Sequence, residues 1–438
     1  MTTPSTALPV GGERWIVWTA VMFIAAMLTL VRAFLAVKLF FLGLFLLSFV
    51  WAIYRKRVQI VSYQRLFWFY LWICVAGLVW AFVGLLHPTN YSQAVYDALR
   101  LYVVWSVAFF VLYTFFRSVP SLRIFHVAMV ASGILIPLIN FVGLYDQYSG
   151  LGLISDNVRD QLGLEIGIWD SYLQFSSINI LSMFLVAPYL LALQFRADAG
   201  KSNSLLAKVS LALSLALVAV SGRRALWVVV ALTPCTILLV SYLTDSYGLL
   251  RIRGRRVLLA WVVASITALA TLIILPEGAL DVGSITRFQQ AFSSEDARTI
   301  QKPYLIGGFL KSPLLGSGFG GRVAYIRSDE QPWGYELTYY QMLFNLGTVG
   351  MTVLGTLFVV YIGAVVRLLR QFREGSVIPF GLLIAFFSLL AGAYSDPYFG
   401  GFDSLFFAGL LPYLSTFQRG FADQQEYDLW SAGLVARG

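Results

Sequence analysis

Residues 33–54 read AFLAVKLFFLGLFLLSFVWAIY, and Arg55-Lys56-Arg57 follow them directly. This run is long enough to cross the hydrocarbon core of a bilayer as a helix, which takes about 20 mostly apolar residues. Lys38 is its single charged residue. Because Lys and Arg gather in cytoplasmic loops, the basic cluster also indicates which end of the helix faces the cytoplasm. The stretch therefore predicts a transmembrane helix with a defined orientation.

The composition extends this prediction to the whole chain. Its 438 residues are 59% hydrophobic and only 12% charged, whereas soluble proteins are about 25% charged. Too few polar side chains remain to cover a soluble surface. The net charge of +9 would suggest nucleic acid as the partner of a soluble protein, but basic loops on one side of a membrane account for it. We therefore expect a bilayer, and no nucleic acid, as a partner.

The expected fold class is an all-α polytopic integral membrane protein with about twelve transmembrane helices. We expect cytoplasmic tails at residues 1–14 and 419–438, helices at 15–275 and 336–418, and an external segment at 276–335. The predicted spans are 15–31, 33–54, 66–86, 98–116, 123–144, 171–195, 205–221, 224–243, 257–275, 337–366, 377–394 and 404–418.

Basic clusters recur at every second connection between these spans. By the positive-inside rule these connections are cytoplasmic, as are both termini. In a bacterium the protein then lies in the inner membrane, with the other connections facing the periplasm. The clusters are Arg55 to Arg57, Arg117 with Arg123, Arg196 with Lys201 and Lys208, Arg251 to Arg256, and Arg367 with Arg370 and Arg373.

Two adjacent arginines, Arg223 and Arg224, lie at a tight external turn between two predicted spans. They can extend to lipid headgroups, as basic residues at helix ends commonly do. However, the positive-inside rule disfavours such a pair on the outer side, and a helix N-terminus favours anions. Guanidinium groups bind phosphate through two parallel hydrogen bonds, so both arginines are candidate phosphate ligands.

The long external segment carries further candidates. Arg287 and Arg298 add cations, and Tyr304 and Tyr335 offer aromatic rings for glycan binding. Apolar residues at near-helical spacing predict one or two short amphipathic helices against the outer membrane face. The glycine-rich stretch Lys311-Ser312-Pro313-Leu314-Leu315-Gly316-Ser317-Gly318-Phe319-Gly320-Gly321-Arg322 is either a plain connector or a place where a ligand approaches the backbone.

Acidic residues supply the remaining candidates. Glu336 begins the helix after the external segment, where it either complements the helix dipole or acts as a general base. Asp396 and Asp403 lie in an aromatic outer turn whose composition suits glycan binding, although turns need such residues anyway. The chain has no nucleotide-binding or metal-binding motif, so we expect no cofactor, no metal and metal-independent chemistry.

These motifs together resemble the bacterial O-antigen polymerase and O-antigen ligase superfamily. The resemblance rests on Ser221-Gly222-Arg223-Arg224, on Arg298 followed by Lys311-Ser312-Pro313-Leu314-Leu315-Gly316-Ser317-Gly318, and on Leu346-Gly347-Thr348-Val349-Gly350. It implies a membrane glycosyltransferase (GT-C-like) fold with a long external loop. It also implies an undecaprenyl-diphosphate-linked oligosaccharide as substrate, with a chain-length regulator and a flippase as partners. Diphosphate binding then falls to Arg223 or Arg224 and to Arg298, with Arg287 as a second candidate.

One departure from the family bears on the reaction. Ligases usually carry a histidine near the start of the helix after the loop, where this chain has Tyr335-Glu336-Leu337. We therefore expect a polymerase of lipid-linked repeat units, with Glu336 and Arg298 as catalytic residues and inversion at the anomeric carbon. The alternatives are a ligase that transfers glycan to lipid A core or protein, and a non-enzymatic flippase for the same lipid-linked glycan.

Overall fold

The computed structural model describes residues 13–31, 33–55, 63–118, 122–169, 172–197, 204–250, 254–263, 297–326, 331–372, 376–394 and 402–417. Within these ranges, seven helices are long and apolar enough to cross a membrane, and three shorter apolar helices accompany them. This is the architecture expected of a polytopic membrane protein. Several predicted segments lie outside the described residues in whole or in part: residues 1–12 of the tail predicted at 1–14, the whole tail at 419–438, residues 264–275 of the span at 257–275, and residues 276–296 and 327–330 of the external segment.

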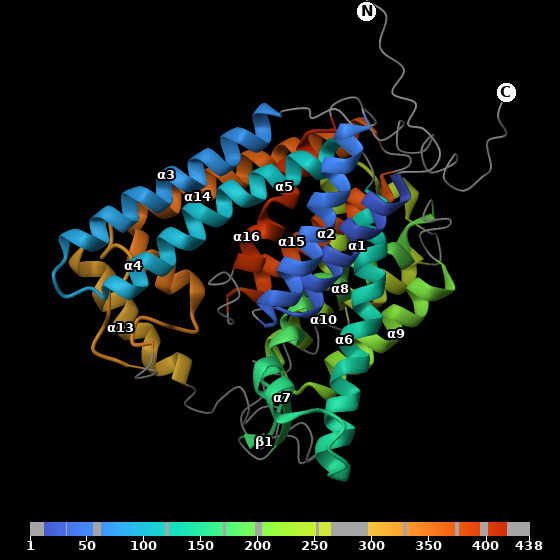
Figure 1. Cartoon of the computed structure of the whole chain (residues 1–438), viewed down its shortest axis with the longest axis horizontal. Helices are drawn as coiled ribbons and strands as arrows, with labels where there is room; N and C mark the ends of the chain where they lie inside the picture. The colour runs from blue at the N-terminus through green and yellow to red at the C-terminus, as the bar shows by residue number, and fades with distance from the viewer. Residues whose placement is uncertain are drawn as a thin grey trace, which may run out of the picture.

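The helices form one bundle (Figure 1). Its N-terminal elements are α1 (Glu13–Thr29), α2 (Leu35–Tyr54), α3 (Gln64–Leu86), α4 (Ser92–Leu99), the π-helix η1 (Arg100–Trp105), α5 (Ser106–Ser118), α6 (Arg123–Ser149) and α7 (Asp156–Leu162). After a β-hairpin come the 3₁₀-helix η2 (Ile178–Ser182), α8 (Met183–Phe195), α9 (Leu205–Val220), α10 (Arg224–Leu243) and η4 (Tyr247–Leu249). The C-terminal elements are α13 (Ala297–Lys311), α14 (Thr338–Gln371), α15 (Val377–Gly392), α16 (Phe402–Ala408) and α17 (Leu410–Ser415).

The structure departs from two of the predicted spans. The span predicted at 171–195 begins as a strand: β1 (Glu165–Trp169) and β2 (Tyr172–Ser176) pair antiparallel, with Glu165 opposite Ser176. The part of the chain that the structure describes is therefore helical apart from this hairpin, and the helical part of this span begins at Ile178. The last predicted span, 404–418, is two short helices, α16 and α17, whose described side chains are buried by the protein itself.

The centre of the bundle is the pair α8 and α15, which pack against each other. Both are apolar on every face, as buried helices are, and nearly all their side chains are buried. Helix α6 packs beside α8 and α9 although Pro137 interrupts its hydrogen bonding. Proline lacks the N–H that would bond the Gly133 carbonyl, and the Ser214 hydroxyl of α9 donates to that carbonyl at 3.2 Å instead.

Contacts between distant segments gather the basic connections at one end of the bundle. The guanidinium of Arg65 donates to the Ser415 carbonyl at 2.6 Å, and the Tyr361 hydroxyl donates to the Arg65 carbonyl at 2.6 Å. Arg370 bonds the Leu243 carbonyl at the end of α10. Arg196, after α8, forms a β-bridge with Leu250, which precedes the basic stretch 251–256. The arrangement agrees with the charge pattern of the sequence.

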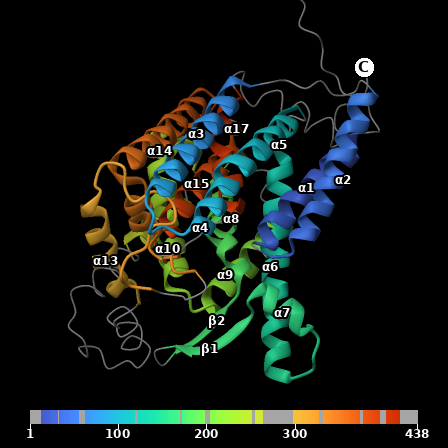
Figure 2. The same cartoon turned by 60° about the vertical axis from the view of Figure 1, so that its left-hand side comes forward.

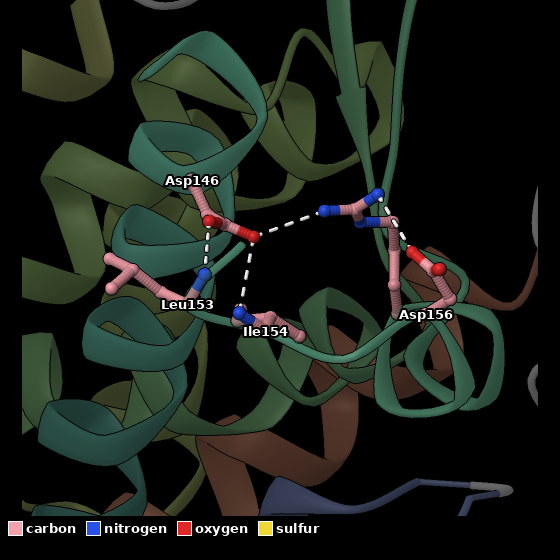
Figure 3. Close-up of polar contacts among 5 residues, drawn as sticks. Asp146, Leu153, Ile154 and Asp156 are labelled. Atoms are coloured by element: carbon pink, nitrogen blue, oxygen red, sulfur yellow. Dashed lines mark hydrogen bonds and ion pairs between the residues drawn. The ribbon is translucent and has the colours of Figure 1, made fainter. Parts of the chain in front are cut away.

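At the opposite end, an ion-pair cluster shapes the connection from α6 to α7 (Figure 3). The buried carboxylate of Asp146 accepts hydrogen bonds from the backbone N–H groups of Leu153 and Ile154. Arg159 donates to Asp146 at 3.0 Å and to Asp156 at 3.3 Å. These partners hold Arg159 in a structural role, so it does not join the cationic site described below.

The glycine-rich turn after α13 packs backbone against backbone. Gly316, Gly318 and Gly320 all have positive φ angles, and so does Gly347, where α14 is kinked. A Cβ on Gly318 would lie 2.1 Å from the Gly84 nitrogen, and one on Gly316 would lie 2.5 Å from a backbone oxygen of α14. The turn therefore joins the end of α3 to the kink of α14, and this packing accounts for its glycines.

Substitution of Gly318 by Ala is expected to destabilise the protein, because the added methyl group meets backbone that cannot move aside and a positive φ angle disfavours any side chain. We expect a loss of about 2 kcal/mol or more. Gly307→Ala is the matched control, since nothing lies within 4 Å of its Cβ position in α13. Thermal unfolding of both variants in detergent measures the difference; equal midpoints would contradict the packing role.

Candidate cationic site at one end of the bundle

Arg223 and Arg224 lie at the N-terminus of α10, at the end of the bundle opposite the basic connections. Gly222 has a φ angle of 66°, which allows the tight turn from α9 into α10. Both arginine side chains are half-buried. The first turn of a helix carries unbonded N–H groups and a positive dipole end, and two guanidinium groups add to that potential. The position suits an anion with several oxygens.

A buried polar network lies behind Arg223. Its Nη2 donates to the backbone carbonyl of Ser177 at 3.3 Å. The Ser177 side chain lies between Asn140 of α6 and Asn179 of η2, and all three are fully buried. The sequence analysis missed this network because isolated Asn and Ser residues in apolar runs show no spacing pattern. An Asn inside a predicted transmembrane span is the one signal that could have drawn attention to it.

The beginning of α14 is held in place by α13. Gln301 is completely buried, and its Oε1 accepts a hydrogen bond from the backbone N–H of Glu336 at 3.0 Å. The Glu336 residue is half-buried. Arg298 lies one turn before Gln301 in α13, so the predicted loop arginine and the predicted base belong to two segments that contact each other. The expectation of a helix within the external segment is confirmed by α13.

Aromatic rings surround α13 at the same end. Tyr304 is 45% exposed and stacks with Tyr325, with ring centroids 6.1 Å apart. Tyr335 is 2% exposed, and its hydroxyl accepts a hydrogen bond from the Val323 N–H at 2.9 Å; burial raises the pKa of this phenol, so it stays protonated at neutral pH. Glycan binding stays a prediction for both tyrosines, and for Tyr335 it requires that the ring become uncovered.

Asp403 lies in the first turn of α16 and is buried with Lys38 of α2. The ammonium nitrogen is 3.0 Å from the Asp403 carboxylate, and the side chains are 2% and 1% exposed. This carboxylate is therefore paired inside the bundle, whereas the sequence analysis placed it on an outer turn. Glycan binding by Asp403 stays a prediction that requires the ion pair to open.

Three predicted site residues are not described in full. Arg287 and Asp396 lie outside the described residues, and for Arg298 only the backbone in α13 is described. Their predicted roles in diphosphate, glycan and transition-state binding therefore stay predictions. Across the described ranges no three or more His, Cys, Asp or Glu side chains form a group that could hold a metal ion.

The last turn of α15 contacts the helices that follow Glu336 and Ser177. On one side the Tyr339 hydroxyl of α14 donates to the Leu390 carbonyl. On the other side a Cβ on Gly392 would lie 2.5 Å from the Phe184 ring of α8, and α10 packs against α8 and α15. Figure 2 shows α13 at the side of the bundle, to the left of α10. Helix α14, which follows Glu336, and helix α8, which follows the Ser177 partner of Arg223, therefore both contact the last turn of α15.

The fold and the site define a helical membrane protein with a cationic site at one end of its bundle. Comparison with known proteins finds no family model and no curated protein that matches the chain.

Proposed function

We propose that the protein is a membrane glycosyltransferase that polymerises lipid-linked polysaccharide repeat units. The observation that carries the proposal is the pair Arg223 and Arg224 at the N-terminus of α10, a position that suits a diphosphate. The resemblance of the glycine and arginine motifs to O-antigen polymerases and ligases supports the same reaction. With the basic connections cytoplasmic, the site faces the periplasm from the inner membrane and both termini are cytoplasmic.

The reaction transfers a glycan from undecaprenyl diphosphate to a sugar hydroxyl of an incoming lipid-linked repeat unit. The anomeric C–O bond to the diphosphate breaks and a new C–O bond forms to the acceptor oxygen. Negative charge grows on the departing diphosphate, and Arg223, Arg224 and Arg298 stabilise it. A preorganised donor of this kind contributes roughly 3 to 4 kcal/mol to transition-state stabilisation.

Glu336 accepts the proton that the acceptor hydroxyl loses in this step. Its place two residues before α14 supports the role, because the hydrogen bond from its N–H to Gln301 fixes the backbone from which the carboxylate extends. Attack from the face opposite the diphosphate inverts the anomeric carbon. We propose that α13 and the glycine-rich turn after it cover the donor and keep water from hydrolysing it.

A GT-C-like architecture with about twelve spans completes this proposal. The enzyme would act on material delivered by a lipid-linked glycan flippase and would work with a chain-length regulator. A ligase that transfers finished glycan to lipid A core or protein uses the same diphosphate chemistry. The two differ in the mutant phenotype: loss of a polymerase leaves single repeat units on the final acceptor, whereas loss of a ligase leaves long chains on undecaprenyl diphosphate.

A flippase for the same lipid-linked glycan is the second candidate function. One observation favours it: the ion pair of Lys38 and Asp403 is buried within the bundle, and ionisable groups inside membrane helices commonly mark translocation pathways. A flippase needs the cationic site for diphosphate binding but forms no glycosidic bond.

Purified protein in detergent, supplied with a synthetic undecaprenyl-diphosphate-linked repeat unit, tests the proposal. A polymerase produces a ladder of elongated lipid-linked products without any membrane. Protein that leaves the substrate unchanged in this assay but moves it across proteoliposomes would be a flippase, and transfer only to lipid A core would identify a ligase.

A further inference from the structure

The hydrogen bonds behind Arg223 determine how each amide of the network is oriented. Asn140 Nδ2 donates to the Ile136 carbonyl at 2.8 Å. Because a carbonyl oxygen can only accept, the Asn140 amide turns its nitrogen, and not its oxygen, toward Ile136. The same Nδ2 donates to Asn179 Oδ1 at 2.8 Å. Asn179 therefore presents oxygen to Asn140 and to the Ser177 hydroxyl, which lies 2.7 Å away.

One hydrogen-bond donor of this network is unsatisfied. Within the described residues, the Asn179 Nδ2 is buried without a hydrogen-bond partner. Buried polar side chains in a bundle that crosses a membrane are costly, and apolar side chains of similar size would fill the same space. Packing alone therefore does not explain why three polar residues from α6 and the β2–η2 junction are gathered at this point.

What the network does fix is the position of one carbonyl. Ser177 is the junction between β2 and η2, and its hydroxyl lies between Asn140 Oδ1 and Asn179 Oδ1, to one of which it donates its single proton. Its backbone carbonyl receives the hydrogen bond from Arg223 Nη2. Any movement of Ser177 is thus passed to the guanidinium at the N-terminus of α10.

We propose that Asn140 and Asn179 are positioning residues that hold Arg223, through Ser177, in the orientation that binds a diphosphate. The inference rests on the proposed function and deepens it. The guanidinium must present two N–H groups in one plane to phosphate oxygens, so a rotated Arg223 keeps its charge but loses that geometry. The network thereby acts on ligand binding without touching the ligand.

Binding of undecaprenyl diphosphate to the purified full-length protein tests this inference. Asn140→Ala is expected to raise the Kd about tenfold, and Ser177→Ala, which keeps the carbonyl but removes the hydroxyl, is expected to act in the same direction. In an Arg223→Ala background, Asn140→Ala should change the Kd by less than about twofold, because the network then has nothing to position.

Ser210→Ala is the matched control for a purely structural effect. It removes a buried hydrogen bond, 3.0 Å long, from Ser210 Oγ of α9 to the Val130 carbonyl of α6, the helix that also carries Asn140. It should lower the thermal midpoint and leave the Kd unchanged. Two results would overturn this inference but not the proposed function. One is an unchanged Kd for both Asn140→Ala and Ser177→Ala, and the other is an Asn140→Ala effect on the Kd that is equally large in the Arg223→Ala background. Normal binding by Arg223→Ala would overturn the proposed function with it.

Discussion

Arg223→Ala is expected to lower the rate of glycan elongation about 10²- to 10³-fold, because it removes a cationic donor from the charge that develops on the departing diphosphate. Arg224→Ala and Arg298→Ala should show losses in the same direction. Elongation is measured with purified protein and in a strain lacking the native gene, where the chain length of the surface glycan is read from gels.

Two further variants sharpen this measurement. Arg223→Lys keeps the charge but not the planar pair of donors, so it should recover only part of the activity. Arg100→Ala is the matched control, since Arg100 is exposed and, within the described residues, forms its one ion pair with the exposed Asp97 at 3.1 Å; this variant should elongate glycan normally. Long-chain polymer at the normal rate from all three Ala variants of the site would contradict the diphosphate role.

Lys38→Ala is expected to destabilise the protein by about 3 to 5 kcal/mol, because it leaves the buried Asp403 carboxylate without its cation. Asp403→Ala should destabilise the protein to a similar extent, because it leaves the buried Lys38 ammonium without its carboxylate. The double variant Lys38→Met, Asp403→Leu should recover much of the loss, since apolar side chains replace both charges together.

Thermal unfolding in detergent and the yield of folded protein measure these effects. The double variant also distinguishes the roles of the ion pair. A polymerase in which the pair is only structural should elongate glycan normally, whereas loss of elongation by a folded double variant would support glycan binding by Asp403. A flippase forms no glycosidic bond, and its double variant should lose translocation in proteoliposomes. Single variants as stable as the double variant would show that the two charges are not coupled.

Hydropathy was sufficient to predict most helices because each span is a continuous apolar run bounded by charged residues. It could not predict that 172–176 is a strand, since the run continues without a break into η2 and α8. Hydropathy also could not predict that protein buries α16 and α17, because it does not distinguish a lipid neighbour from a protein neighbour.

Pairs far apart in the sequence were also beyond prediction. Lys38 and Asp403 are 365 residues apart, and only the arrangement of α2 against α16 brings them together. Asn140 in α6 and Ser177 at the β2–η2 junction are likewise 37 residues apart. Arg223 and Arg224 could be selected from the sequence alone, because their cationic character conflicts with the charge expected at an outer turn.

The glycine-rich turn has a consequence for how relatives of this chain are recognised. Its amide and carbonyl groups bond the main chain of α3 and α14: the Phe319 N–H donates to the Trp80 carbonyl at 3.1 Å, and the Gly318 N–H to the Asn345 carbonyl at 2.9 Å. Such contacts constrain the path of the main chain, but they allow the neighbouring side chains to be substituted. Sequences that share these glycines should therefore share a bent helix docked on its neighbour, and their substrates can differ widely.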